Sequence, residues 1–163
     1  MATTTLNLIS IRDLNKNELQ DKVALVRVDF NVPMENGQVT DDTRIRSSLD
    51  TIDYLLAADT KVVLMAHLGR PKGKVVDEFR LRPVYEYIKA TFSYDINYVE
   101  DCIGDVASNA VNNMAKGSIL LLENVRFYDA ETNNDAEFSK QLANLADFFV
   151  QDAFGAVHRA HAS

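Results

Sequence analysis

The sequence predicts an α/β fold of three layers, in which a parallel sheet lies between two layers of helices. Short apolar runs alternate along the 163 residues with segments whose apolar residues recur at helical spacing. Four of the runs are almost continuously apolar, which is typical of strands buried on both faces. Strand–helix–strand repetition favours parallel pairing with right-handed crossovers, so we expect one Rossmann-like domain.

Five runs are expected to form the strands of this sheet. They cover residues 22–28, 61–66, 95–99, 118–124 and 147–151. The run 95–99 is the weakest of them, because it is short and only partly apolar. The dipeptide Asn36-Gly37, between Pro33 and Thr40, predicts a tight turn of the kind that joins two short antiparallel strands.

The first two helices follow the first two long strands in chain order. In residues 45–56 the apolar side chains fall on one helical face, and Asp41 and Asp42 are placed to cap the helix start. Pro83 fits the first turn of the second helix, whose apolar face lies within residues 84–88. Each helix therefore has a start signal and an apolar face that can cover a sheet.

Two further helices are expected in the second half of the chain. The third begins at Asp101 and has an apolar face that includes Val106. In the fourth, Asn134 and Glu137 have capping-box spacing ahead of an apolar face in residues 138–145. The four helices and five strands together complete the three-layer pattern.

The overall charge argues against a nucleic-acid or anionic-membrane partner. The net charge is −7 and the isoelectric point is about 4.9, whereas phosphate backbones are bound by proteins with a basic excess. A small anionic ligand needs only a local group of arginines, which this sum does not exclude. Cys102, the one cysteine, is expected in the core of a protein from a reducing compartment. There is no secretory signal and no apolar run of about 20 residues, so we expect a cytoplasmic protein.

Polar and basic residues recur directly after the predicted strands. If the strands are parallel, the groups that follow them emerge at one edge of the sheet, where open α/β sheets bind ligands. These groups are Asp29, Asn31, His67, Arg70, Glu123, Asn124, Arg126, Asp152, His158 and Arg159. We therefore expect them to face a common crevice.

Arg44 adds a further cation near the same edge. It lies in the first turn of its helix, where a positive charge opposes the helix dipole unless an anion binds there. Guanidinium groups bind phosphate and carboxylate with fixed orientation. Four arginines after separate elements, Arg44, Arg70, Arg126 and Arg159, predict a ligand with more than one negative group.

Other interpretations of these residues remain open. Taken singly, an arginine after a strand is usually a solvated surface residue, and Asp29 can serve as a loop or capping residue. His158 and His161 could share a helical face, but no third ligand stands at metal spacing, so we predict no metal site. The segment GRPKGK lacks the glycine spacing and the Ser or Thr of a phosphate-binding P-loop.

Five motifs in order carry a family resemblance. VRVDFNVP, DDTRI, AHLGRPKGK, LLENVRF and DAFGAVHRAHAS, from about Leu19 to Ser163, resemble the N-terminal domain of phosphoglycerate kinase. This resemblance implies a monomeric enzyme of glycolysis and gluconeogenesis. Such an enzyme transfers a phosphoryl group between ATP and 3-phosphoglycerate, giving 1,3-bisphosphoglycerate and ADP, with Mg2+.

The resemblance also implies roles for the matched residues. It places Asp29, Phe30 and Asn31 at the hydroxyl and carboxyl end of the substrate. It places the 3-phosphate on His67, Arg70, Arg126 and Arg159, in a loop shaped by Leu68 and Gly69. It makes Arg44 both a substrate ligand and the catalytic residue nearest the transferred group, where charge develops.

Members of this family continue well beyond the HRAHAS motif. The resemblance therefore implies that residues 1–163 are a partial N-terminal, phosphoglycerate-binding domain, with a sheet incomplete at its C-terminal end. It implies that ATP and Mg2+ bind a C-terminal domain absent from this chain, and that the chain alone is inactive. A different hypothesis is a non-catalytic anion-binding module that keeps the same pocket, and a third is a hydrolase with Asp29 as nucleophile.

Overall fold

The computed structural model describes residues 8–163. Its central sheet has five strands in the order β5-β6-β4-β1-β7, and every neighbouring pair is parallel. The strands are β1 (Val23–Arg27), β4 (Lys61–Met65), β5 (Ile96–Tyr98), β6 (Ile119–Leu121) and β7 (Phe148–Gln151). The predicted parallel α/β sheet is therefore confirmed.

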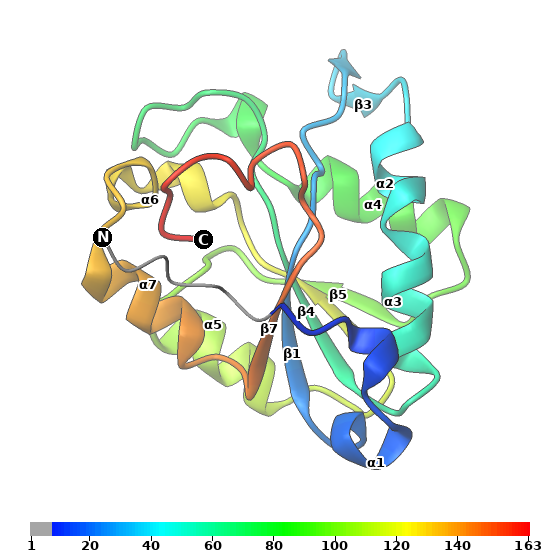
Figure 1. Ribbon diagram of the computed structural model, residues 1–163. Helices are drawn as coiled ribbons and strands as arrows, with labels where there is room; N and C mark the ends of the chain where they lie inside the picture. Colours follow the sequence, from blue (N-terminus) through cyan, green and yellow to red (C-terminus); the bar gives the residue numbers. More distant parts are fainter. Residues whose placement is uncertain (1–7) are drawn as a thin grey trace.

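Helices cover both faces of the sheet, as Figure 1 shows. One layer consists of α2 (Thr43–Ser47), α3 (Leu49–Leu56) and α4 (Arg82–Thr91). The other consists of α5 (Gly104–Asn112), α6 (Asp129–Thr132) and α7 (Ala136–Ala143). The remaining short elements are α1 (Lys16–Leu19) and three 3-10 turns, η1 (Ile11–Asp13), η2 (Asp77–Phe79) and η3 (Val125–Phe127).

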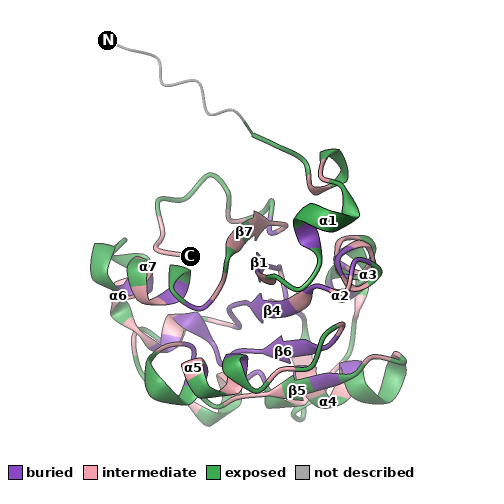
Figure 2. Ribbon diagram, turned by 90° about the horizontal axis from the view of Figure 1, so that it is seen from below, coloured by how far each residue is buried: buried purple, intermediate pink, exposed green. Residues whose placement is uncertain are grey.

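Two apolar cores lie on the two faces of the sheet because side chains alternate along each strand. Val26 packs in the core that includes α3 and α4, and its neighbour Leu25 packs in the core that includes α5 and α7. Figure 2 shows β1, β4 and β6 buried between the two helical layers. Burial on both faces explains why these strands are continuously apolar in sequence.

The last strand differs from its prediction. β7 lies at the edge of the sheet, where Phe149 is 51% exposed, so the expected burial on both faces is wrong for this strand. The predicted strand 118–124 is also too long, because regular pairing ends at Leu121. Beyond it the chain turns, and the Glu123 carboxylate accepts hydrogen bonds from the backbone N–H groups of Leu81 and Asn124.

The first helix is interrupted where one continuous helix was expected. Ser48 is buried between α2 and α3, and its N–H bonds the Ile45 carbonyl at 3.1 Å in a tighter turn. Asp42 is the N-cap residue of α2 but makes no side-chain capping bond, and Asp41, one residue earlier, accepts from Thr43 N–H at 2.8 Å. The carboxylate of Asp42 instead accepts from Tyr87 Oη at 2.7 Å, which ties α2 to α4.

The third and fourth helices begin later than predicted. α5 starts at Gly104 rather than Asp101, whose carboxylate accepts from the N–H of Cys102, and Val106 is exposed on the outer face. α7 is capped by Asp135, which accepts from Phe138 N–H at 2.8 Å, and Asn134 lies outside it. In both cases the spacing of apolar residues predicted that a helix forms, but it did not predict the residue at which the helix begins.

Three local predictions are confirmed. Asn36 and Gly37, with φ of 51° and 74°, form the turn between β2 (Met34–Glu35) and β3 (Gln38–Val39). Pro83 lies in the first turn of α4. Cys102 is buried in the core, and burial raises the pKa of its thiol well above the usual value.

In the part of the chain that the structure describes, no helix is both long and apolar enough to traverse a lipid bilayer.

Candidate functional site

A cavity of about 300 Å3 opens at the carboxyl ends of β1, β4 and β7. These strands run towards the upper half of Figure 1. The first turn of α2, the turn η3 and the segment after β7 complete its walls. Its lining residues are Asp29, Asn31, Arg44, His67, Gly69, Arg70, Arg126, Ala153, Gly155, Ala156 and Arg159. The structure thus brings the four predicted arginines, together with Asp29, Asn31, His67 and Gly69, into one crevice.

Two residues assigned to the site by resemblance do not line the cavity. Phe30 is 0% exposed and Leu68 is 3% exposed, and both side chains lie in the apolar core. Each alternates with neighbours that line the cavity, so an extended backbone points it the other way. Only their backbone atoms remain for the crevice loops.

Four other strand-end residues expected in the crevice do not line it: Glu123, Asp152, His158 and Asn124, which is buried behind it. His158 is exposed and does not line the cavity. Glu123 turns away to pair with Arg80, at 3.1 Å from Oε2 to Nη1. Asp152 accepts a hydrogen bond from Thr51 Oγ1 at 3.2 Å on another side of β7. Only some of the polar residues that follow strands therefore lie in the same cavity.

Asp29 holds Arg44 at the mouth of the cavity. Arg44 Nη1 lies 3.1 Å from Oδ1 and 3.2 Å from Oδ2 of Asp29, and the Arg44 side chain is half exposed. Asp29 Oδ1 also accepts from the N–H of Asn31 at 3.2 Å. Asn31 Oδ1 accepts from the N–H of Gly69 at 2.9 Å, which connects the end of β1 to the loop after β4.

Gly69 is where the loop after β4 has no room for a side chain. Its φ of +63° is disfavoured for other residues, and a Cβ atom there would lie 2.4 Å from the Phe79 ring. Its carbonyl accepts from Arg126 Nη1 at 3.4 Å. The glycine thereby lets the loop pass between the Phe79 ring and the Arg126 guanidinium.

We expect Gly69→Ala to lower the free energy of unfolding by about 2 kcal/mol more than Gly37→Ala. Both glycines have positive φ, but a Cβ at Gly37 would meet nothing within 4 Å, so the difference isolates the clash with Phe79. Urea unfolding of both variants measures it. Equal losses in the two variants would show that the Phe79 ring moves aside without cost.

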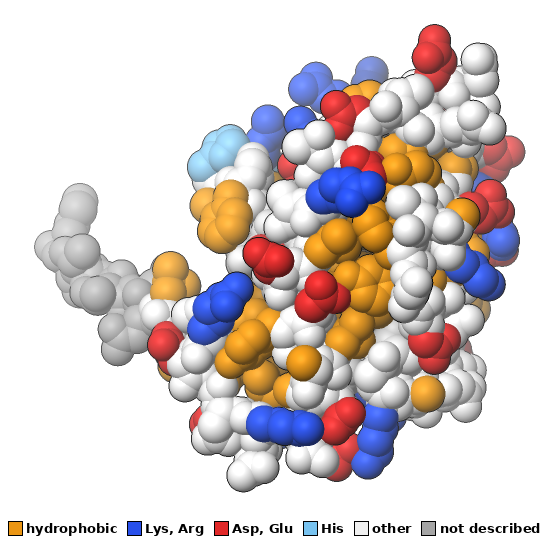
Figure 3. All heavy atoms as spheres, turned by 90° about the vertical axis from the view of Figure 1, so that its right-hand side faces the viewer, with side chains coloured by type: hydrophobic (Ala, Val, Ile, Leu, Met, Phe, Trp, Pro, Cys, Tyr) orange, Lys and Arg blue, Asp and Glu red, His pale blue; other side chains and the backbone are white. Residues whose placement is uncertain are grey.

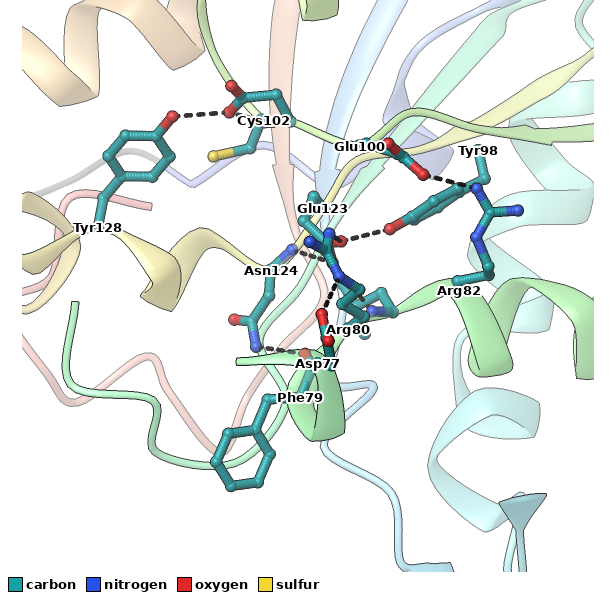
Figure 4. A network of polar contacts seen from close by, with 12 residues as sticks. Asp77, Phe79, Arg80, Arg82, Tyr98, Glu100, Cys102, Glu123, Asn124 and Tyr128 are labelled. Carbon is teal, nitrogen blue, oxygen red and sulfur yellow. Dashed lines mark hydrogen bonds and ion pairs between the residues drawn. The ribbon is translucent and has the colours of Figure 1, made fainter. Parts of the chain in front are cut away.

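Asn124 braces the turn that carries Arg126. It is 0% exposed, its Oδ1 accepts from Arg126 N–H at 3.0 Å, and its Nδ2 donates to two carbonyls. These belong to Leu68, at 2.7 Å, and to Phe79, at 2.9 Å. Figure 4 shows Asn124 between Phe79 and the Glu123–Arg80 pair. One amide group therefore fixes η3, the loop after β4 and η2 relative to one another.

Glu123 anchors the other side of this brace. Its carboxylate is buried and accepts from Arg80, from the backbone N–H groups of Leu81 and Asn124, and from Tyr98 Oη. Burial, followed by the hydrogen bond to Glu123, raises the pKa of the Tyr98 hydroxyl above its usual value. The phenol therefore stays protonated and remains a donor to the carboxylate (Figure 4).

The electrostatics of the cavity favour an anion. Four arginines and one aspartate line it, and burial, followed by the charge of Arg159, lowers the pKa of Arg126. Arg126 Nε is buried without a hydrogen-bond partner among the described residues. By contrast, acidic and basic side chains are interspersed on the face that carries α2 and α3 (Figure 3). Clustered guanidinium groups repel one another, and a multiply charged anion would relieve this repulsion.

The same cavity does not fit a metal ion. Among residues 8–163, no three His, Cys, Asp or Glu side chains are grouped so that they could hold one. Mg2+ requires carboxylate, carbonyl or water oxygens, whereas guanidinium groups offer only donors.

Sequence reasoning missed two residues that support the site, Arg27 and the ring of Phe79. Arg27 lies in β1 and is 1% exposed. A charged residue within a strand that is expected to be buried on both faces indicates a buried polar contact, and this could have been recognised from the sequence. Asn124 was expected to face the crevice, but it is buried and does not line the cavity. Nothing in the local sequence points to Phe79, because its contact at Gly69 depends on how the loop folds back.

Comparisons with known proteins agree on one family. The family model described as phosphoglycerate kinase matches residues 11–163. Curated proteins of that name from Prochlorococcus marinus (strain MIT 9515) and Moorella thermoacetica are each 52% identical over 95% of this chain. The chain spans only 39% of the length of each of these relatives.

Solved structures give the same result. The phosphoglycerate kinase of Coxiella burnetii is similar with a TM-score of 0.80 and 36% identity, covering 95% of this chain and 37% of that one. The enzyme of Pyrococcus horikoshii OT3 is similar with a TM-score of 0.83 and 27% identity, covering 95% and 39%. The chain described here therefore corresponds to part of the fold of these proteins.

Proposed function

This chain belongs to the phosphoglycerate kinase family, and on that premise we propose that it forms the phosphoglycerate-binding part of such a kinase. The observation that carries the proposal is the convergence of Arg44, Arg70, Arg126 and Arg159 on one cavity. A ligand with a phosphate at one end and a carboxylate at the other has enough negative charge to offset four guanidinium groups.

The 3-phosphate is assigned to His67, Arg70, Arg126 and Arg159. The three arginines supply charge-assisted hydrogen bonds, and the unpartnered Arg126 Nε is a further donor in the same region. Gly69 contributes by letting the loop pass close to the Phe79 ring, where a Cβ atom would clash. Phe30 and Leu68 take part only through the backbone, since their side chains belong to the core.

The hydroxyl and carboxyl end of the substrate is assigned to Asp29 and Asn31, with Arg44 nearest the group that is transferred. Asp29 already pairs with Arg44, so the guanidinium is held at the cavity mouth before a ligand enters. The proposed reaction is reversible transfer of a phosphoryl group from ATP to the carboxylate of 3-phosphoglycerate, giving 1,3-bisphosphoglycerate and ADP. Arg44 is the proposed catalytic residue, because a guanidinium beside the transferred group stabilises its developing charge.

ATP and Mg2+ are assigned to parts of the family fold that this chain does not cover. The chain spans 39% of its curated relatives, and its described residues do not fit a magnesium ion. This chain by itself, a partial N-terminal domain, is therefore proposed to bind phosphoglycerate without turning it over. A cytoplasmic monomer that serves glycolysis and gluconeogenesis is the proposed setting of the whole kinase.

Titration with 3-phosphoglycerate tests the function. We expect saturable shifts of the backbone amides of Gly69 and Arg126 in an NMR spectrum of the folded chain. Glycerate, which lacks the phosphate, and inorganic phosphate, which lacks the carboxylate, serve as half-ligand controls and are expected to bind more weakly. Absence of a saturable shift in folded protein contradicts the proposal, whereas equal affinity for inorganic phosphate indicates the non-catalytic anion-binding module.

We expect Arg126→Met to weaken 3-phosphoglycerate binding by roughly 10- to 100-fold, because a charge-assisted hydrogen bond is worth about 1.5–3 kcal/mol. Arg82→Met is the matched control, since Arg82 pairs with Glu100 at 2.7 Å outside the cavity lining. Calorimetric titration measures both variants. An unchanged affinity in Arg126→Met would remove this residue from the phosphate site.

A further inference from the structure

Arg27 makes a buried contact with His67 behind the cavity wall. Its Nη2 lies 3.0 Å from His67 Nδ1, and both residues are buried, with 1% and 8% exposed. Arg27 is fixed in place by two more hydrogen bonds, from Nη1 to the Val28 carbonyl at 3.0 Å and from Nε to Ser163 Oγ at 2.9 Å. The guanidinium therefore has little freedom to turn away from the imidazole.

The chemistry of this contact determines the state of the histidine. Arginine remains protonated in proteins and has only donors, so a hydrogen bond from Nη2 requires a lone pair on His67 Nδ1. A ring that accepts at Nδ1 and is neutral carries its proton on Nε2. Since Nδ1 is occupied by Arg27 and His67 lines the cavity, Nε2 is the ring nitrogen left for a ligand.

We propose that Arg27 is a positioning residue that holds His67 as the neutral Nε2–H tautomer, so that the imidazole donates a hydrogen bond to the bound phosphate without carrying a charge. The inference deepens the proposed function and rests on it for the identity of the anion. Neither residue is needed as a proton carrier in this arrangement.

The other groups that face His67 favour the same state. Burial first, and then the charges of Arg27, Arg126, His161 and Arg159 in that order, lower the pKa of His67 to about 3. These groups come from β1, η3 and the segment after β7. A charged imidazole would place one more cation among arginines that already repel one another, whereas a neutral donor adds a hydrogen bond.

Glu131 supports Arg27 from the other side. Its carboxylate is 0% exposed, accepts from the backbone N–H of Ser163 at 3.0 Å, and also accepts from Ser163 Oγ. Arg27 donates to that same Oγ, so Ser163 connects carboxylate, guanidinium and imidazole in one chain of hydrogen bonds. The carboxylate offsets part of the cost of burying the Arg27 charge.

The tautomer is measured directly in ligand-free protein. In long-range 1H–15N correlation spectra of the 15N-labelled chain, we expect the His67 ring to show the neutral Nε2–H pattern from pH 5 to pH 8. His158, which is exposed and does not line the cavity, provides the internal reference ring in the same spectra. An Nδ1–H pattern, or an imidazolium at pH 6, would overturn the inference.

Arg27→Met removes the hydrogen-bond donor to His67 Nδ1. This variant tests whether Arg27 sets the tautomer of His67 or only contributes to stability. We expect His67 in this variant to lose the fixed tautomer and to titrate at a higher pH. The pH profile of 3-phosphoglycerate affinity between pH 5 and 8 is then expected to differ from that of the wild type, in which the phosphate of the ligand already titrates at about pH 6. Arg27→Lys, which retains a charged donor, is expected to restore the Nε2–H pattern at least in part. A folded Arg27→Met that keeps the wild-type ring pattern contradicts the positioning role. If it does not fold, the wild-type spectrum remains decisive.

The two proposals fail in different ways. Saturable 3-phosphoglycerate binding to a protein whose His67 is charged or Nδ1-protonated overturns the tautomer and leaves the proposed function. A neutral Nε2–H ring in folded protein that does not bind 3-phosphoglycerate overturns the proposed function and leaves the Arg27 contact.

Discussion

Asn124→Ala is expected to lower the free energy of unfolding by about 3 kcal/mol, because it removes one buried and two partly buried hydrogen bonds to backbone groups. These are the carbonyls of Leu68 and Phe79, which lose their donor, and the N–H of Arg126, which loses its acceptor. Asn124 is fully buried, so water does not readily replace the lost bonds. We also expect weaker 3-phosphoglycerate binding, since the Gly69 loop and Arg126 lose their common support.

Urea unfolding and calorimetric titration measure the two effects of Asn124→Ala. Asn109→Ala is the control, because Asn109 is exposed within α5 and alanine is at least as favourable in a helix. Asn124→Asp separates the two functions of the amide, as it retains an acceptor for Arg126 N–H but loses the Nδ2 donors. A loss below about 1 kcal/mol in Asn124→Ala would mean that the three segments hold their arrangement without the brace.

The stability of the wild-type protein is expected to fall more steeply than that of His67→Gln as the pH decreases from about 6.5 to about 3. Burial first, and then Arg27, lower the pKa of His67 from 6.5 to about 3 in the folded chain. Above pH 6.5 the ring is neutral in both states, and its contribution to stability is complete. Below it, the unfolded chain binds a proton that folded His67 does not, so stability is lost progressively until the folded pKa is reached.

The expected difference between the two proteins approaches about 1.4 kcal/mol per pH unit within this window. Glutamine is the chosen replacement, because its amide can accept from Arg27 and donate to the cavity without titrating. Urea unfolding at several pH values measures the difference. Carboxylates that titrate in the same window, such as Asp152 with its raised pKa, are present in both proteins and cancel. Parallel pH profiles would show that His67 takes up its proton at the same pH in the folded and unfolded chains, which contradicts the lowered pKa.

Much of the site was predictable because the sheet is parallel. Residues after β1, β4 and β7 emerge at one edge, and the arginines expected there line one cavity. The same reasoning failed for His158 and Glu123, which also follow strands. Sequence position gives the end of a strand, but the turn beyond it decides whether a side chain enters the crevice. The turn after β6 directs Glu123 towards Arg80 instead.

The sequence alone determined the layers, the strands and most of the cavity lining, because hydrophobic alternation and helical spacing are local properties that a chain shows within a few residues. The tertiary structure alone decided that Arg27 contacts His67, 40 residues away, and that Asn124 joins Leu68, 56 residues away, to Arg126. Such bonds depend on strand register and on how loops fold back across the sheet edge. The charge state of the histidine and the position of Arg126 follow from those contacts, which no local pattern specifies.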